Sequence, residues 1–93
     1  MKLATLKNGT RDGRLVVVSR DLSRATDAAP VAATMQQLVE DWDARAPGLQ
    51  SIYELLNAGG ALHDFAFDPA QAMSLLPRTH QFVDASEIGR AHV

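Results

Sequence analysis

The feature that most constrains the fold of this chain is the unbroken run Leu15-Val16-Val17-Val18. β-Branched residues favour an extended backbone, and a strand without polar alternation is covered on both of its faces. In a chain of only 93 residues, that cover must come from helical segments of the same chain or from a partner that is absent. The run therefore predicts a buried strand at the centre of a small sheet.

The residues before this run predict a β-hairpin. Lys2 to Lys7 is a short candidate strand, and the stretch Asn8-Gly9-Thr10-Arg11-Asp12-Gly13 follows it. The pairs Asn-Gly and Asp-Gly supply the positive φ angles that tight hairpin turns require. Gly9 and Gly13 are accordingly interpreted as turn residues and not as a loop that cradles a ligand. Residues 21–27 are interpreted as a polar connection.

Two apolar stripes at helical spacing come next. The first helix is expected to begin at Pro30 and to end near Arg45, and Pro47 is expected to separate it from the second. The second helix is expected to stop at Asn57-Ala58-Gly59-Gly60. The stripes consist of Val31, Met35, Leu38, Val39, Trp42 and Ala46, and of Leu49, Ile52, Tyr53 and Leu56. Trp42 and Tyr53 are interpreted as packing residues and not as a ligand platform.

These elements predict an α+β fold, in which a small N-terminal β-hairpin or short sheet packs against two amphipathic helices. After Gly60, Phe65-Ala66-Phe67 is predicted to form a short edge segment. Asp68-Pro69 is predicted to cap a helical turn that contains Met73, Leu75 and Leu76 and stops at Pro77. Residues 78–93 show no period.

Composition excludes several classes of function. The chain contains no cysteine, so it has no disulfide framework, zinc–thiolate site or thiol nucleophile. Its net charge of -2 gives no basic footprint for nucleic acid and no polybasic patch for a membrane. The longest purely apolar run is far too short to cross a bilayer, and Lys7, Arg11 and Asp12 interrupt any signal peptide. We therefore expect a cytoplasmic protein with neither nucleic acid nor membrane as a partner.

Motifs for catalysis are also missing. No serine lies in a Gly-x-Ser-x-Gly elbow, and the serines are Ser19, Ser23, Ser51, Ser74 and Ser86. His63 and Asp64, with Asp68 nearby, match no established ligand spacing, so they are interpreted as solvent-exposed polar residues. Asp41 and Asp43, on either side of Trp42, are interpreted as a solvated helix face.

One stretch near the end carries more chemistry. Leu76-Pro77-Arg78-Thr79-His80-Gln81-Phe82-Val83-Asp84-Ala85-Ser86 places a carboxylate and then a hydroxyl after an apolar and aromatic segment. Such a pair could hold a divalent ion, although one carboxylate cannot make a magnesium site by itself.

Three segments together resemble the start of bacterial fumarylacetoacetate hydrolase family proteins. They are the opening KLATLKNGTRDGRLVVVSRDLSRA, the later FAFDP and the closing LPRTHQFVDAS, so the likeness extends from residue 1 to about residue 86. The resemblance implies an N-terminal domain ahead of a larger, mostly β catalytic domain. That family cleaves a carbon–carbon bond of 1,3-dicarbonyl acids, for example fumarylacetoacetate to fumarate and acetoacetate. The resemblance also implies a divalent cation (Mg, Mn or Ca) that chelates the diketone while a His-based pair activates water.

The resemblance carries few roles onto this chain. Asp84 matches the family's first metal ligand and Ser86 matches the serine two positions later. His80 stands where an aromatic residue is usual, and Ala85 where glycine is common. The histidine expected seven positions after the aspartate is Ala91, with His92 one place further on. The resemblance therefore implies one metal ligand here, Asp84, and no catalytic or cofactor-binding residue.

The final residues have a separate interpretation. Glu87-Ile88-Gly89-Arg90-Ala91-His92-Val93 is what GAG ATC GGA AGA GCA CAC GTC encodes, and all but the first base of that string matches a common short-read sequencing adapter. Because the resemblance stops where this string starts, we expect the biological sequence to end at Ser86. The alternative is a natural divergent tail.

Two hypotheses of function follow. In the first, residues 1–86 are the N-terminal domain of a fumarylacetoacetate hydrolase-like enzyme of aromatic catabolism, residues 87–93 are the artefact, and the catalytic domain is absent. The chain would then be inactive and bind no cofactor. Its partners would be its own catalytic domain and, in the parent enzyme, a second subunit of a homodimer. In the second, the chain is a self-contained interaction module. The first hypothesis expects the Val strand to lack a cover, and the second expects a cooperatively folded monomer.

Overall fold

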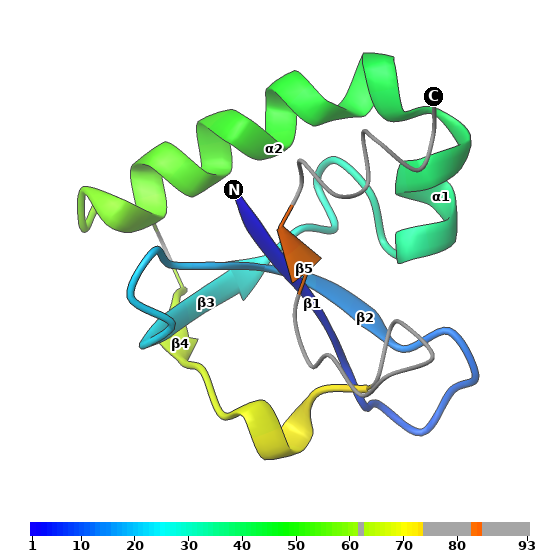
Figure 1. Ribbon diagram of the computed structural model, residues 1–93, viewed down its shortest axis with the longest axis horizontal. Coiled ribbons are helices and arrows are strands. Elements are labelled where there is room, and N and C mark those ends of the chain that lie inside the picture. Colours follow the sequence, from blue (N-terminus) through cyan, green and yellow to red (C-terminus); the bar gives the residue numbers. More distant parts are fainter. Residues whose placement is uncertain (62, 74–82, 85–93) are drawn as a thin grey trace.

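A computed structural model describes residues 1–61, 63–73 and 83–84 of the chain. Its centre is an antiparallel sheet of five strands in the order β4-β3-β2-β1-β5 (Figure 1). The strands are β1 (Lys2–Leu6), β2 (Arg14–Val18), β3 (Arg24–Asp27), β4 (Phe65–Ala66) and β5 (Val83–Asp84). The helices are α1 (Met35–Glu40), α2 (Trp42–Asn57) and the 3₁₀ turn η1 (Pro69–Gln71). The predicted α+β fold is confirmed.

The predicted hairpin is formed by β1 and β2. Their register places Lys2 opposite Val18 and Leu6 opposite Arg14. Gly9 and Gly13 have φ angles of 83° and 67°, a region that residues with a side chain rarely adopt. The two glycines are therefore turn residues, as their sequence pattern predicts.

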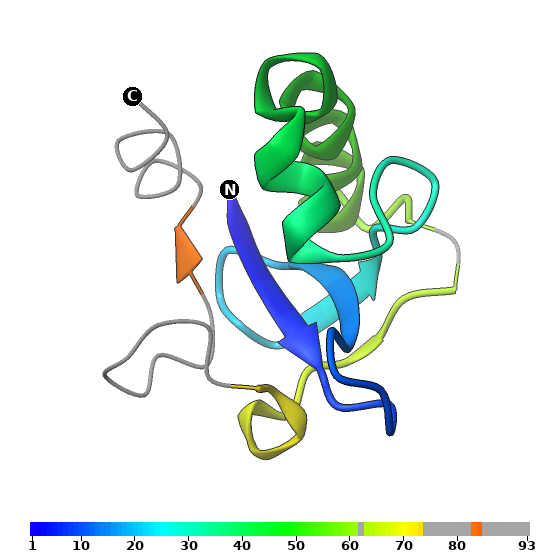
Figure 2. The same ribbon diagram turned by 90° about the vertical axis from the view of Figure 1, so that its right-hand side faces the viewer.

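Both faces of β2 are buried, and the chain itself supplies the cover. Val16, Val17 and Val18 have no exposed surface. Both helices lie on one side of the sheet, and the segment that contains η1 lies on the other (Figure 2). The helix-side cluster contains Leu3, Leu15, Val17, Ala28, Ala32, Leu38, Leu49, Tyr53 and Leu56. The second cluster contains Ala4, Val16, Val18, Ala25, Phe67 and Ala72. The expectation that the Val strand lacks a cover is wrong, because residues 65–72 fold back under it.

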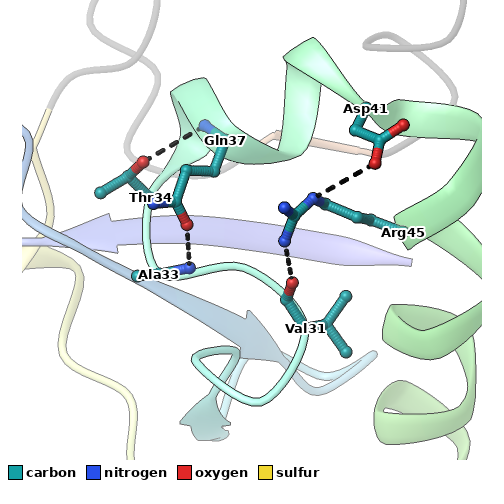
Figure 3. A network of polar contacts seen from close by, with 6 residues as sticks. All are labelled: Val31, Ala33, Thr34, Gln37, Asp41 and Arg45. Carbon is teal, nitrogen blue, oxygen red and sulfur yellow. Dashed lines mark hydrogen bonds and ion pairs between the residues drawn. The ribbon is translucent and has the colours of Figure 1, made fainter.

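The two helices have boundaries that differ from the prediction. The first begins at Met35, not at Pro30, because Thr34 caps it: the Thr34 side chain accepts a hydrogen bond from the Gln37 N–H at 3.2 Å. Gln37 in turn accepts one from the N–H of Ala33, the residue before the cap, at 3.0 Å, so two side-chain hydrogen bonds hold the start of the helix (Figure 3). The helix ends at Glu40, because Asp41 leaves the helical region with φ -139°.

Arg45 fixes the junction between the two helices. Its guanidinium donates a hydrogen bond to the Val31 carbonyl and lies 3.9 Å from the Asp41 carboxylate (Figure 3). The side chain therefore links α2 to the loop before α1 and to the residue between the helices. Asp41 is mostly exposed, in agreement with the solvated face that the sequence predicts.

Pro47 does not separate two helices. It lies inside α2, which continues from Trp42 to Asn57. Proline removes one backbone hydrogen bond, but the stripe of Leu49, Tyr53 and Leu56 beyond it packs on the sheet and keeps the helix continuous. Tyr53 and the half-buried Trp42 are packing residues, as predicted, whereas Val39 of the first stripe is exposed.

Part of the predicted polar connection is a strand. Arg24 to Asp27 form β3, which places Ala25 opposite Val18 and Asp27 opposite Val16. The alternation of this segment is weak because only Ala25 and Thr26 are buried. Its pairing with β2 therefore depends on the backbone hydrogen bonds and on the turn before it.

The segment after α2 is close to the prediction. Phe65 and Ala66 form the predicted edge strand β4, and Asp68 caps η1 by accepting a hydrogen bond from the Ala70 N–H. The turn ends at Gln71, so Met73 lies outside it, and Leu75, Leu76 and Pro77 lie outside the described residues. Within the described part of the chain, no helix has the length and apolar character needed to cross a membrane.

Candidate functional site

Asp84, the metal ligand implied by the resemblance, lies in β5 at the edge of the sheet. It pairs with Lys2, and Val83 pairs with Leu3. His80, Ala85, Ser86 and the whole of 87–93 lie outside the described residues.

The described residues do not provide a complete metal site. No group of three or more His, Cys, Asp or Glu side chains comes together in residues 1–61, 63–73 and 83–84. Divalent hard cations require several oxygen ligands, and the described residues do not bring such a set together.

The residues around His63 were expected to be solvent-exposed, and Asp64 is only partly so. Asp64 contacts Arg24, with Oδ2 3.2 Å from Nε and Oδ1 3.1 Å from a terminal guanidinium nitrogen. Asp68 is occupied with capping η1. His63 is exposed and has a positive φ of 60°. The two carboxylates therefore have separate structural contacts.

Among the described residues, the turn between β2 and β3 contains a dense network of side-chain hydrogen bonds. Asp21 Oδ1 accepts hydrogen bonds from the Ser23 hydroxyl at 2.6 Å, the Ser19 hydroxyl at 2.7 Å and the Ser23 N–H at 3.0 Å. These donors, the Ser23 hydroxyl first, lower the pKa of Asp21 from 3.8 to about 2. Ser19 Oγ also accepts from the N–H groups of Ser23 and Arg24, at 3.2 and 3.0 Å. The turn is therefore closed by its own side chains.

This turn is attached to two other parts of the fold. The Arg20 N–H donates to Asn57 Oδ1 at 2.8 Å, which joins the turn to the C-terminal end of α2. The Arg24–Asp64 ion pair joins it to the segment before β4. The hydrogen bond between them raises the pKa of Arg24 and lowers that of Asp64.

An open depression of about 420 Å³ lies among these groups. It is lined by Ser19, Arg20, Asp21, Ser23, Arg24, Leu56, Asn57, Gly59 and Asp64. We call this set the turn surface. A second depression of about 400 Å³ lies near the start of β2, where the Arg14 guanidinium is 3.4 Å from Asp27 and 5.2 Å from the centre of the Phe65 ring. Arg14 is thus already occupied by contacts within the domain.

None of the described serines is arranged as a nucleophile. Ser19 and Ser23 donate to Asp21, and Ser51 donates to the Pro47 carbonyl at 3.2 Å. A nucleophilic serine needs a base that accepts its proton and a third group that orients the base. A carboxylate whose pKa is about 2 is a poor base at neutral pH. These hydroxyls therefore have a structural role.

The sequence analysis missed the turn surface. The signal for it was the spacing Ser19-x-Asp21-x-Ser23, because aspartate and serine side chains hydrogen-bond to backbone N–H groups two residues further on. Its contacts with Asn57 and Asp64 could not be read from the spacing, because those partners are 37 and 40 residues away.

Comparison with known protein families matches residues 1–78 to the family described as Fumarylacetoacetase N-terminal domain 2. This match covers strands β1 to β4, both α-helices and η1, and it ends before β5. A search of curated proteins gives no match.

Proposed function

We propose, on the premise that this chain belongs to the fumarylacetoacetase N-terminal domain 2 family, that it is the non-catalytic N-terminal domain of a fumarylacetoacetate hydrolase-like enzyme. Such an enzyme hydrolyses a carbon–carbon bond of a 1,3-dicarbonyl acid in aromatic catabolism, the route of tyrosine degradation. The family match carries this proposal, because it covers 78 residues of the 93.

The contacts of the polar side chains support a non-catalytic role for this stretch. Asp21, Asp64 and Asp68 are each held in a contact that stabilises the fold. The described histidine, His63, is exposed on a loop. An enzyme of this type needs a metal, a base for water and a pocket for the diketone, and these would come from the catalytic domain.

Asp84 would contribute one oxygen ligand to the metal of the whole enzyme, as the resemblance implies. Mg, Mn or Ca would have to receive its other ligands from the catalytic domain, because the described residues do not supply them. When bound, the ion would polarise the diketone and stabilise the departing enolate. The partners of this domain would be that catalytic domain and a second subunit in a homodimer.

The test starts from the gene. Sequencing the source DNA beyond the Ser86 codon should show an open reading frame that continues into a catalytic domain, and the encoded protein should cleave fumarylacetoacetate or a related 1,3-dicarbonyl acid with added divalent cation. The 93-residue chain should show no turnover in the same assay. Turnover by the short chain, or none by the long one with any such acid, contradicts the proposal.

The second candidate is a self-contained interaction module, and one observation favours it. The central strand is covered on both faces by the chain's own residues, so a folded domain does not need a catalytic domain as its cover. A monomeric chain that unfolds cooperatively, from a gene with a genuine stop codon near residue 93, would support this candidate over the first.

A further inference from the structure

The direction in which the chain leaves the sheet identifies one end of the domain. One row of directly opposed residues crosses all five strands: Asp84, Lys2, Val18, Ala25 and Phe65. β5 runs antiparallel to β1, so the chain reaches Asp84 at the end of the sheet where β1 begins and β2 ends. Everything that follows Asp84 in the sequence therefore starts from this end.

The turn surface lies at this same end. Ser19 is the residue directly after Val18, and two strand spacings, about 10 Å, separate the backbone of Val18 from that of Asp84. The C-terminal end of α2 comes to the same place, because Arg20 is hydrogen-bonded to Asn57. The glycine-containing turn of residues 7–13 lies at the opposite end of β1 and β2.

Side-chain hydrogen bonds hold the turn in an unusual backbone conformation. Leu22, within the turn, has a φ of 64°, a conformation that is unfavourable for any residue with a side chain. Strained residues of this kind persist only where surrounding contacts enforce them, as Ser19 and Asp21 do here. These contacts therefore hold the backbone beside the polar depression in this conformation.

Among the described residues, one charged side chain of this surface makes no polar contact. Arg24 is paired with Asp64, and Asp21 is occupied by the two serines. Arg20 is exposed, and its guanidinium makes no hydrogen bond or ion pair with the residues that the structure describes. Arg20 lines the polar depression, and an exposed guanidinium of this kind can pair with a carboxylate on an opposing surface.

We propose that the turn surface is the contact face for the part of the enzyme that follows Asp84, and that Arg20 pairs there with a carboxylate of that part. The inference rests on the proposed function, since it requires a continuing chain, and it adds which face is covered and which residue makes the polar contact. A face near the exit point of the chain can be reached by a short length of chain after Asp84, and short loops lose the least entropy when they close.

Hydrogen exchange on two proteins tests the proposal: the 93-residue chain and the uninterrupted gene product. In the long protein, the amides of Arg20 and residues 57–59 should exchange at least about tenfold more slowly than in the short chain, whereas those of residues 8–12 should not change. Equal exchange at the turn surface in the two proteins would overturn the proposal.

A pair of variants of the long protein gives a second measurement, which does not depend on the short chain folding alone. Arg20→Gln should lower the melting temperature of the long protein and weaken the exchange protection of residues 57–59. Lys7→Gln removes a positive charge from the opposite end of the sheet and should change neither. Identical effects of the two variants would overturn the role of Arg20. These exchange and melting results are independent of the diketone hydrolysis assay, so the contact face and the proposed function can fail separately.

Discussion

The two turns that join the first three strands both contain residues with positive φ, but they stabilise this conformation in different ways. The turn between β1 and β2 contains two glycines with positive φ, Gly9 and Gly13. The turn between β2 and β3 contains none, and its residue with positive φ is Leu22. Hairpin loops in which a left-handed residue follows a β-turn usually place glycine there. In the second turn, side-chain hydrogen bonds from Ser19, Asp21 and Ser23 provide the stability that glycine would give.

The comparison shows that turn geometry can be encoded locally or by a network. A glycine turn depends on backbone freedom, so its tolerance to substitution is set by what surrounds each glycine. A side-chain turn depends on particular donors and acceptors, so it is sensitive to their removal and to pH. Four predictions test this difference.

The largest effect is expected at Gly13. A Cβ atom there would lie 2.5 Å from Thr5 Cγ2 and 2.7 Å from both the Leu6 carbonyl oxygen and Met73 Sδ. Gly13→Ala should therefore lower the free energy of unfolding by about 3 kcal/mol in urea denaturation, from overpacking and a left-handed backbone together. Gly9→Ala is the matched control, since nothing lies within 4 Å of its Cβ position, and it should cost only about 1 kcal/mol. Equal losses would show that the close approach is not the cause.

The next effect concerns Ser19, which is 5% exposed. Ser19→Ala removes the side-chain acceptor of the Arg24 N–H and one of the two acceptors of the Ser23 N–H, so it should cost about 1–3 kcal/mol by the same measurement. Thr10→Ala, in the glycine turn, removes the exposed acceptor of the Gly13 N–H and should cost about 0.5 kcal/mol or less. If Thr10→Ala costs as much as Ser19→Ala, the contrast between the two turns is wrong.

Acid should affect the second turn through Asp21. Its pKa is about 2 in the folded protein and near 3.8 when unfolded, so its hydrogen bonds contribute fully above about pH 4. That contribution is lost as the pH falls from about 4 to about 2, because the unfolded chain binds the proton first. Asp64, whose pKa is also lowered, adds a loss of the same sign.

Asp21→Asn should therefore flatten the fall in urea midpoint between pH 4 and pH 2 relative to the unmodified protein. Asp12→Asn, in the glycine turn, is the control and should leave the slope as it is. A slope unchanged in Asp21→Asn would mean that the turn does not depend on an ionised carboxylate.

The smallest effect is expected at Leu22, where glycine should be more stabilising than alanine, the reverse of their usual order. Leu22→Gly and Leu22→Ala lose the same apolar contacts with the second cluster, but glycine adopts a φ of 64° without strain. The glycine variant should therefore be more stable than the alanine variant by about 1 kcal/mol in thermal or urea unfolding. Alanine at least as stable as glycine would show that residue 22 leaves the left-handed region in solution.

The sequence alone determined the parts of the fold that depend on neighbouring residues. The pairs Asn8-Gly9 and Asp12-Gly13 specify the first turn, and the run from Leu15 to Val18 specifies a strand buried on both faces. The stop at Asn57 and the edge strand at Phe65 were also correct. In each case a local property of the backbone, or the apolar character of one segment, is sufficient.

The tertiary structure decided the conformation of segments whose local sequence favours a different one. Pro47 favours a helix boundary, but packing of the residues beyond it on the sheet keeps α2 continuous. Arg24 to Asp27 have little strand character, but pairing with β2 makes them a strand. The turn surface needs Asn57 and Asp64, which are distant in sequence. Such contacts form only once the chain has folded, because folding brings together residues that are distant in sequence. No local pattern identifies those partners.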